Sequence, residues 1–444
     1  MKTEKVRTLT FDIERLGPAS QDSPIKLSNN RGDNIVDYVT DDARILFDPS
    51  LVSCRRCREG VTIPSMEVAG PRERIFFKPD DIKAAVLTAG GLCPGLNDVI
   101  RGIVLELHYH YGVREILGIK YGYRGLVSDS QERPVRLTPE MVETIHREGG
   151  TILGSSRGKQ DIREIVDFIA ERKINVLFTI GGDGTLRGAA AISEEAERSG
   201  YKLSVIGVPK TIDNDIAFVE RSFGFETAYS IAQSALRSGH NEARGAPNGI
   251  GLVKLMGRYS GFVAAMASLA CGDANFVLVP EVEFDLEGEN GFLAALEKRM
   301  NEAGHALVVV AEGAGQKFFE GQDLGKDASG NRKLGEIGTF LKASIKKHFD
   351  GKDIEANVKY IDPSYMIRSV PASATDSVFC LQLAQHAVHA AMSGRTNMIV
   401  AIWNNTFVHV PIKTAISERK QLDPEGPTWL AVVEATGQPL SMKD

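Results

Sequence analysis

Two short apolar runs in the chain end abruptly in acidic and small residues, which is typical of a ligand site built on strand ends. The first ends in I-G-G-D-G-T at residues 180–185, and the second, V-I-G-V-P-K-T-I-D-N-D, spans residues 205–215. Ligands of open α/β sheets bind at the carboxyl ends of strands, so we expect Asp183, Asp213 and Asp215 around one pocket. Glycine amides can approach a phosphate closely, and carboxylates can hold magnesium or accept a proton. These residue types predict phosphoryl transfer.

Each carboxylate also has a structural interpretation. Asp183 would serve equally as an acidic cap on the following helix, although the neighbouring glycines and Thr185 favour a metal ligand. Asp213 and Asp215 are two residues apart, so an extended segment would point both to the same side, where one could take a proton from an acceptor hydroxyl. The alternative is a turn in which these side chains cap their own backbone. The adjacent Lys210 and Thr211 favour the catalytic interpretation.

Further charged residues follow predicted strand ends or small-residue loops. Three of them are arginines, Arg157, Arg258 and Arg368, whose guanidinium forks suit phosphate oxygens; for any one of them a surface salt bridge is the alternative. Glu312 follows an apolar run at residues 307–311. It would be a buried unpaired charge unless it lined a polar pocket, where a sugar hydroxyl is a suitable partner.

From residue 82 onward, predicted strands and helices alternate, which indicates parallel sheets with helices on both faces. The fold class predicted is therefore α/β, with two Rossmann-like parallel-sheet lobes. One strand–helix turn, G-G-L-C-P-G at residues 90–95, could bind an anion on its amides. The domains expected are an N-terminal extension with little regular structure at 1–80, a nucleotide-binding lobe at 81–223 plus 370–415, a second lobe at 224–369 and a C-terminal tail at 416–444.

Composition narrows the function classes. The 444 residues carry a formal net charge of −6, which gives no electrostatic case for nucleic acid. Five cysteines are too scattered for a disulfide framework. Cys54 and Cys57 have redox or zinc spacing, but with no second ligand pair nearby we expect ordinary thiols. There is no apolar signal core and no run of membrane-spanning length, so a cytoplasmic location without a membrane partner is expected.

Several segments together resemble the 6-phosphofructokinase family, and most of all its plant and trypanosome ATP-using branch. The resemblance runs in order from about residue 70 to 410. The segments that carry it are A-G-G-L-C-P-G-L-N (89–97), G-S-S-R (154–157), G-G-D-G-T (181–185), P-K-T-I-D-N-D (209–215), G-F-E-T-A (224–228), M-G-R (256–258), E-G (312–313) and Y-I-D-P-S-Y-M-I-R (360–368).

The resemblance implies the phosphofructokinase fold and a kinase of glycolysis that uses Mg²⁺ and ATP to phosphorylate the 1-hydroxyl of fructose 6-phosphate. It also implies an allosteric homodimer or homotetramer. The implied catalytic residues are Asp213 as the base, Thr211, Arg258 and Gly91. ATP would be bound by Gly91, Arg157, Gly158, Gly182, Asp183, Gly184 and Thr185, with Asp183 on the metal. The sugar phosphate would be bound by Thr211, Ile212, Asp213, Met256, Gly257, Arg258, Glu312, Tyr365, Met366, Ile367 and Arg368.

Two positions bear on the phosphoryl donor, and the family divides on this point. Pyrophosphate-using members tend to have aspartate where this chain has Gly184, and a carboxylate there would repel the α-phosphate of a nucleotide, so Gly184 favours ATP. Lys210 is also found in pyrophosphate users. The alternatives are therefore a pyrophosphate-dependent enzyme or a catalytically silent regulatory subunit. Compact bacterial members bind the sugar 6-phosphate with two arginines from a neighbouring subunit. The matching positions in this chain are Gly249 and Lys359.

Overall fold

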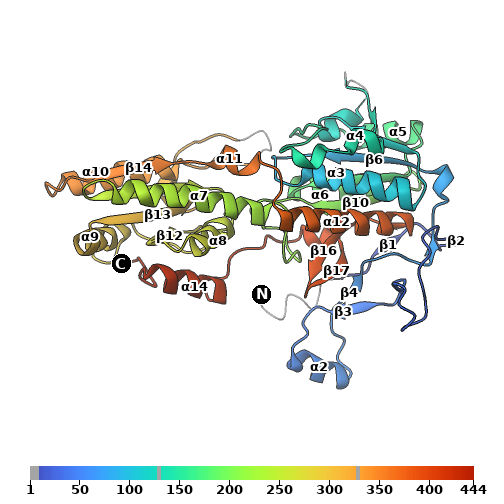
Figure 1. The fold of residues 1–444 in the computed structure, drawn as a ribbon, viewed down its shortest axis with the longest axis horizontal. Helices are drawn as coiled ribbons and strands as arrows, with labels where there is room; N and C mark the ends of the chain where they lie inside the picture. The colour runs from blue at the N-terminus through green and yellow to red at the C-terminus, as the bar shows by residue number, and fades with distance from the viewer. Residues whose placement is uncertain (1–9, 128–131, 327–330) are drawn as a thin grey trace. The chain divides into compact units, whose positions relative to one another are not determined.

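The computed structural model describes residues 10–127, 132–326 and 331–444. The chain divides into two compact units, and it passes between them several times. The first unit holds the residues up to 211 together with 216–223 and 371–418. The second holds 212–215, 224–370 and 419–444. Figure 1 shows the elements of both units along the chain.

A nine-stranded sheet forms the centre of the first unit, in the order β3-β4-β17-β16-β10-β9-β6-β7-β8. Its strands are β3 (Arg44–Leu46), β4 (Ser65–Val68), β6 (Lys83–Thr88), β7 (Glu115–Ile119), β8 (Val135–Arg136), β9 (Val176–Gly181), β10 (Ser204–Pro209), β16 (Met398–Trp403) and β17 (Thr406–Pro411). The five central strands, from β16 to β7, are parallel. The outer strands are antiparallel, so the parallel sheet expected from the sequence is confirmed in its core and gains antiparallel edges.

Helices cover the central strands because almost every residue of these strands is apolar and buried. Buried strands of this kind need a helical layer on each face. The helices α3 and α12 pack together, with α12 also on β10, and α5 packs on α6, which contacts β9 and β10. The helices of this unit are α2 (Leu51–Arg58), α3 (Leu96–Leu105), α4 (Pro139–Val142), α5 (Ile162–Glu171), α6 (Asp183–Arg198), α12 (Ala374–Met392) and α13 (Ile412–Ala415). Short 3₁₀ helices lie at η1 (Pro79–Asp81), η3 (Gly122–Leu126) and η4 (Ile145–Arg147), and a π-helical segment, η2 (Glu106–His110), continues α3.

The N-terminal residues are more regular than the sequence suggested. They supply β3 and β4 to the large sheet, and β1 (Glu14–Arg15) and β2 (Gln21–Asp22) pair with β15 (Arg395–Thr396) and β5 (Arg74–Ile75). A buried ionic cluster fastens them: Glu67 contacts Arg72, Arg395 and His409. The sequence did not reveal these strands, because each is too short to give a clear alternation of apolar and polar residues. Cys54 is a free thiol, and the side chain of Cys57 lies outside the described part.

The second unit has a four-stranded, fully parallel sheet in the order β12-β13-β11-β14. Alternate residues of β11 face opposite layers: Ile250 and Leu252 join a core with α9 and α10, whereas Gly251 lies against the backbone of Gly239 in α7. The strands are β11 (Gly249–Leu255), β12 (Phe276–Leu278), β13 (His305–Ala311) and β14 (Asn357–Ile361). The helices are α7 (Phe225–Arg244), α8 (Phe262–Cys271), α9 (Phe292–Ala303), α10 (Ile337–Asp350), α11 (Ser364–Arg368) and α14 (Pro427–Thr436), with a turn at η5 (Gln316–Phe319).

The α/β class and the two parallel sheets predicted from the sequence are thus confirmed. Among the described residues, no helix combines the length and the apolar character that crossing a membrane requires.

Candidate functional site

Three neighbouring parallel strands of the first unit end at the same edge of the sheet. Thr88 of β6 is aligned with Ile180 of β9, which is aligned with Val208 of β10. Adjacent strands lie roughly 4.8 Å apart, so the segments after these strands are neighbours. The glycine turn at 90–91, the start of α6 and the pair 210–211 therefore meet at one edge, as the sequence predicted for β9 and β10.

The glycine turn after β6 is held from two sides. The hydroxyl of Ser155 donates to the carbonyl oxygen of Gly90 at 2.5 Å, and Nζ of Lys210 donates to that of Gly91 at 2.6 Å. Gly90 has φ of +87°, which suits glycine. The side chain of Lys210 thus contacts the backbone of a predicted nucleotide-binding residue. Thr211 lies next to it, with its carbonyl oxygen bonded to Ser222 at 2.5 Å.

The G-S-S-R segment runs beside the same turn. The amide of Gly90 donates to the carbonyl oxygen of Ser156 at 3.2 Å, and Thr88 Oγ1 donates to that of Gly154 at 2.7 Å. Arg157 and the following Gly158 are exposed. This arrangement leaves the Arg157 guanidinium available to a phosphate near the turn.

The helix α6 begins directly after β9, with Gly182 as its N-cap and Asp183 as its first residue. Asp183 therefore lies within the helix, whereas the structural interpretation of the sequence had it as the cap. The first amides of a helix point out of its N-terminus and favour anions there. A Cβ built on Gly184 would meet no atom within 4 Å, and the residue is exposed. Thr185 is buried, and its carbonyl oxygen accepts from Tyr123 at 2.6 Å.

The carboxylate of Asp183 suits a role in holding Mg²⁺ beside a nucleotide. Its side chain is 26% exposed and forms an ion pair of 3.1 Å with Arg187 on the next turn of α6. In the described part of the chain, no group of three or more histidine, cysteine or acidic side chains is placed to hold a metal ion. Magnesium in nucleotide sites is usually held by one or two carboxylates plus phosphate oxygens and water. The single carboxylate of Asp183 fits that donor set.

The segment 212–215 belongs to the second unit and does not have the extended form expected of it. It is a turn, in which Asn214 has φ of +55°. Asp213 Oδ2 accepts the amide of Arg258 at 3.4 Å, whereas Asp215 pairs with Arg419 at 2.8 Å. The expectation that both carboxylates face the same side of an extended strand is therefore wrong, and their surroundings differ.

The M-G-R and E-G segments come together because β11 and β13 are neighbours in register. Leu255 is aligned with Ala311, and the amide of Gly313 donates to the carbonyl oxygen of Gly257 at 3.0 Å. A Cβ on Gly313 would collide with the carbonyl of Arg258, and one on Gly257 would lie 2.5 Å from that of Ser260. Both glycines are thus required for the close approach that sets Glu312 beside M-G-R.

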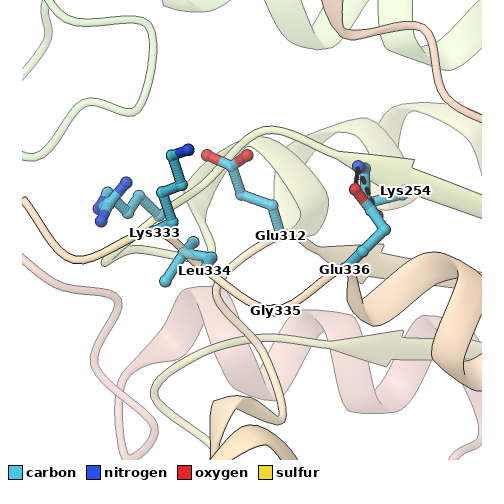
Figure 2. A pocket seen from close by; sticks show the side chains of 7 residues that line it. Lys254, Glu312, Lys333, Leu334, Gly335 and Glu336 are labelled. Atoms are coloured by element: carbon cyan, nitrogen blue, oxygen red, sulfur yellow. Dashed lines mark hydrogen bonds and ion pairs between the residues drawn. The ribbon is translucent and has the colours of Figure 1, made fainter. Parts of the chain in front are cut away.

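A polar cavity of about 250 Å³ opens at these strand ends. Its lining residues are Lys254, Arg258, Glu312, Lys333, Leu334, Gly335 and Glu336. Figure 2 shows the Glu312 carboxylate and the Lys333 amine on one side, and the bonded pair of Lys254 and Glu336 on the other. Burial raises the pKa of Glu312, and the charges of Lys254 and Arg258 oppose that rise. A cavity with both charge signs suits a ligand that carries hydroxyls and a phosphate.

The Y-M-I-R residues form the short helix α11 after β14. Tyr365 and Met366 are 76% and 69% exposed, whereas Ile367 is completely buried. The side chain of Ile367 therefore anchors the helix, and Arg368 lies over the ring of Tyr365, with 4.6 Å between the guanidinium carbon and the ring centroid.

Gly249 lies at the opposite end of β11, paired with Asn357 of β14. A Cβ there would collide with the carbonyl oxygen of Ala243, so no arginine fits at this position. Lys359, two residues along β14, is exposed.

Three residues of the site were missed from the sequence. Arg187 contacts Asp183, and their spacing of four indicates such a contact only when both residues lie in one helix, as they do in α6. Lys254 and Gln316 contact the segment 333–336; Gln316 accepts the amide of Gly335 at 2.9 Å. Their signal is weak, because a lone lysine in a strand and a glutamine in a turn indicate nothing by themselves.

Comparison with known proteins assigns the family. Residues 83–391 match the family model described as Phosphofructokinase. The chain is 47% identical over 446 residues to an ATP-dependent 6-phosphofructokinase of Borreliella burgdorferi, with 99% of each chain covered. It is 48% identical over 380 residues to ATP-dependent 6-phosphofructokinase 1 of Arabidopsis thaliana, covering 84% of this chain and 79% of that one.

Among solved structures, a pyrophosphate-dependent phosphofructokinase of Marinobacter aquaeolei superposes with a TM-score of 0.67 at 21% identity. The superposition covers 81% of this chain and 92% of that one, and it supports the fold. With most of the chain matched by the family model and nearly all of it by a close relative, the chain belongs to the phosphofructokinase family.

Proposed function

We propose that the chain is an ATP-dependent 6-phosphofructokinase, which transfers the γ-phosphoryl group of MgATP to the 1-hydroxyl of D-fructose 6-phosphate. A relative of that name matches it at 47% identity over 99% of the chain. The observation that carries the choice of donor is the open space beside Gly184. A helix is less stable with glycine than with alanine, and no neighbouring atom of the described chain lies close enough to require glycine at position 184. A ligand that approaches the backbone there explains the glycine best.

On the donor side, the first-turn amides of α6 and the turn at Gly91 receive phosphate oxygens, and Arg157 neutralises their charge. Asp183 holds Mg²⁺, which when bound neutralises charge on the phosphate oxygens. Lys210 keeps the Gly91 turn in one conformation through its bond of 2.6 Å. These groups orient the donor and stabilise charge that develops during transfer.

On the acceptor side, Glu312 accepts a hydrogen bond from a sugar hydroxyl, and Arg258 and Arg368 bind phosphate oxygens. Asp213 takes the proton of the attacking 1-hydroxyl. Thr211 and the backbone of Ile212 contact the sugar beside it, while Met256, Gly257, Tyr365 and Met366 complete the surface. These residue roles are proposals that rest on the family resemblance and on the contacts described above.

Two alternatives remain within the family. The same reaction with pyrophosphate is opposed by Gly184, where a carboxylate would exclude a nucleotide. A silent regulatory subunit is opposed by the presence of Asp183, Asp213 and Arg258, which such a subunit would not need. A homo-oligomer and a cytoplasmic location stay predictions; light scattering of the purified chain tests the first.

The deciding experiment measures fructose 1,6-bisphosphate formation from fructose 6-phosphate and Mg²⁺, with ATP and pyrophosphate in parallel. Turnover with ATP alone is expected. Turnover with pyrophosphate alone would overturn the proposed donor, and no product with either donor would favour the regulatory subunit.

A further inference from the structure

Lys254 is a buried cation on the strand that leads into M-G-R. It lies on β11, and its side chain is 9% exposed. Its Nζ donates to both carboxylate oxygens of Glu336, at 2.7 and 2.8 Å, and pairs with Asp362 at 2.9 Å. An ammonium group has only three donor hydrogens, so these contacts occupy Lys254 fully and fix its direction.

The two partners belong to segments that carry the proposed acceptor residues. Glu336 ends the segment 333–336, which lines the cavity together with Glu312 (Figure 2). Asp362 Oδ1 accepts the amide of Ser364 at 3.1 Å and its hydroxyl at 2.5 Å, and so orders the start of α11. Lys254 therefore connects the M-G-R strand to one wall of the cavity and to the helix that carries Arg368.

The charges around Lys254 explain why an apolar side chain would not replace it. Burial by itself would lower the pKa of Lys254, but the hydrogen bonds to Glu336 and Asp362 outweigh burial and raise it. Without this cation, both carboxylates would repel each other and Glu312, whose pKa burial already raises. The wall and the helix would then move apart.

We propose that Lys254 is a positioning residue for the sugar phosphate: it holds the segment 333–336 and α11 where Glu312 and Arg368 can meet the acceptor, and it takes no part in the transfer. This inference rests on the proposed function, because it assigns Lys254 to the acceptor half of that reaction.

The test compares steady-state kinetics of the full chain with those of Lys254→Met. The KM for fructose 6-phosphate is expected to rise about tenfold or more, whereas kcat and the KM for ATP change less than about threefold. Glu336→Gln keeps the shape but removes a charge, so a smaller rise of the same kind is expected and serves if Lys254→Met folds poorly. The matched control is Lys352→Met, which removes the ion pair to Glu297 of 2.5 Å in the same unit and should leave all three constants unchanged.

Calorimetric titration of each variant with fructose 6-phosphate gives a readout without turnover. Binding is expected to weaken most in Lys254→Met, less in Glu336→Gln and not at all in Lys352→Met. Lys254→Arg, which keeps the charge, should recover part of the loss. The wild type must first be active. If Lys254→Met then keeps the fructose 6-phosphate KM and affinity of the wild type, the positioning role alone is overturned. The same holds if kcat falls and both KM values change to a similar extent. A folded wild type with no activity on either donor overturns the proposed function instead.

Discussion

Nζ of Lys210 donates a hydrogen bond of 2.6 Å to the carbonyl oxygen of Gly91 and so joins the end of β10 to the turn after β6. Lys210 is 6% exposed, and the contact fixes the peptide that follows the strand end. Lysine at this position is shared by members that use either donor. The contact of Lys210 with the Gly91 backbone gives a reason for this shared lysine, because a site for either donor needs the turn after β6 in place.

Replacing Lys210 with methionine should therefore reduce catalysis without changing the donor. We expect kcat with ATP to fall by about two orders of magnitude, as on loss of a preorganised donor, while pyrophosphate remains unused. The control is Lys202→Met, whose amine also bonds a backbone carbonyl, that of Leu16, at 2.6 Å, but lies exposed and away from the strand ends. Coupled assays with both donors check this; comparable losses in the two variants would contradict the role of Lys210.

Gly184 provides a direct test of donor selection. Gly184→Asp should raise the KM for ATP by about a hundredfold, because a carboxylate would meet the phosphates at the start of α6. Gly184→Ala separates size from charge. Its Cβ meets no protein atom within 4 Å, so the free energy of unfolding should stay equal or rise by up to about 1 kcal/mol, with a modest rise in the KM for ATP. Unchanged ATP kinetics in Gly184→Asp would remove the argument for ATP from this position.

The regular elements were predictable wherever the hydrophobic pattern was long. The alternation of strands and helices from residue 82 onward was predicted, and long elements such as the strand β11 and the helix α12 belong to it. The N-terminal strands were not, because two to four residues carry no periodicity and their stability comes from partners such as β17, over 300 residues away. Pairing over that distance is a tertiary effect, which local pattern does not encode.

The candidate site was predictable by residue type but not by conformation. The glycines and acids at strand ends were identified. For the segment 212–215 the turn was kept only as the alternative, although Asn214 takes a left-handed conformation that an extended strand excludes. As a result Asp215 pairs with Arg419, which lies 204 residues further along the chain. The cavity wall at 333–336 could not be foreseen either, since it depends on contacts to Gln316 and Lys254.

These different surroundings predict different consequences for the two neighbouring aspartates. Asp213→Asn should reduce kcat by about three orders of magnitude or more, because an amide cannot accept the hydroxyl proton, while fructose 6-phosphate still binds. Asp215→Asn removes the ion pair to Arg419 and should lower kcat less than about tenfold. Turnover and calorimetric binding measured on both variants check this. Full activity of Asp213→Asn would exclude it as the base.

Buried histidines predict how stability depends on pH. The ring of His386 stacks on Phe407, with 4.4 Å between centroids, and within the described chain Nδ1 of His386 has no hydrogen-bond partner. Burial first, and then the charges of His409 and Arg72, lower the pKa of His386 to about 4. The folded form therefore keeps His386 neutral, whereas the unfolded chain binds a proton below its ordinary pKa of about 6.5.

Because the unfolded state takes up this proton, the free energy of unfolding should fall as the pH decreases from about 6.5 to 4. His386→Phe preserves the stacking and removes the titrating group, so its loss of stability should be less steep by up to about 1.4 kcal/mol per pH unit in that window. Urea unfolding of both chains at a series of pH values measures the two slopes. Parallel curves would show that His386 is protonated alike in the folded and unfolded states, and acid sensitivity would then have to come from other buried groups such as His409, whose pKa burial also lowers to about 4.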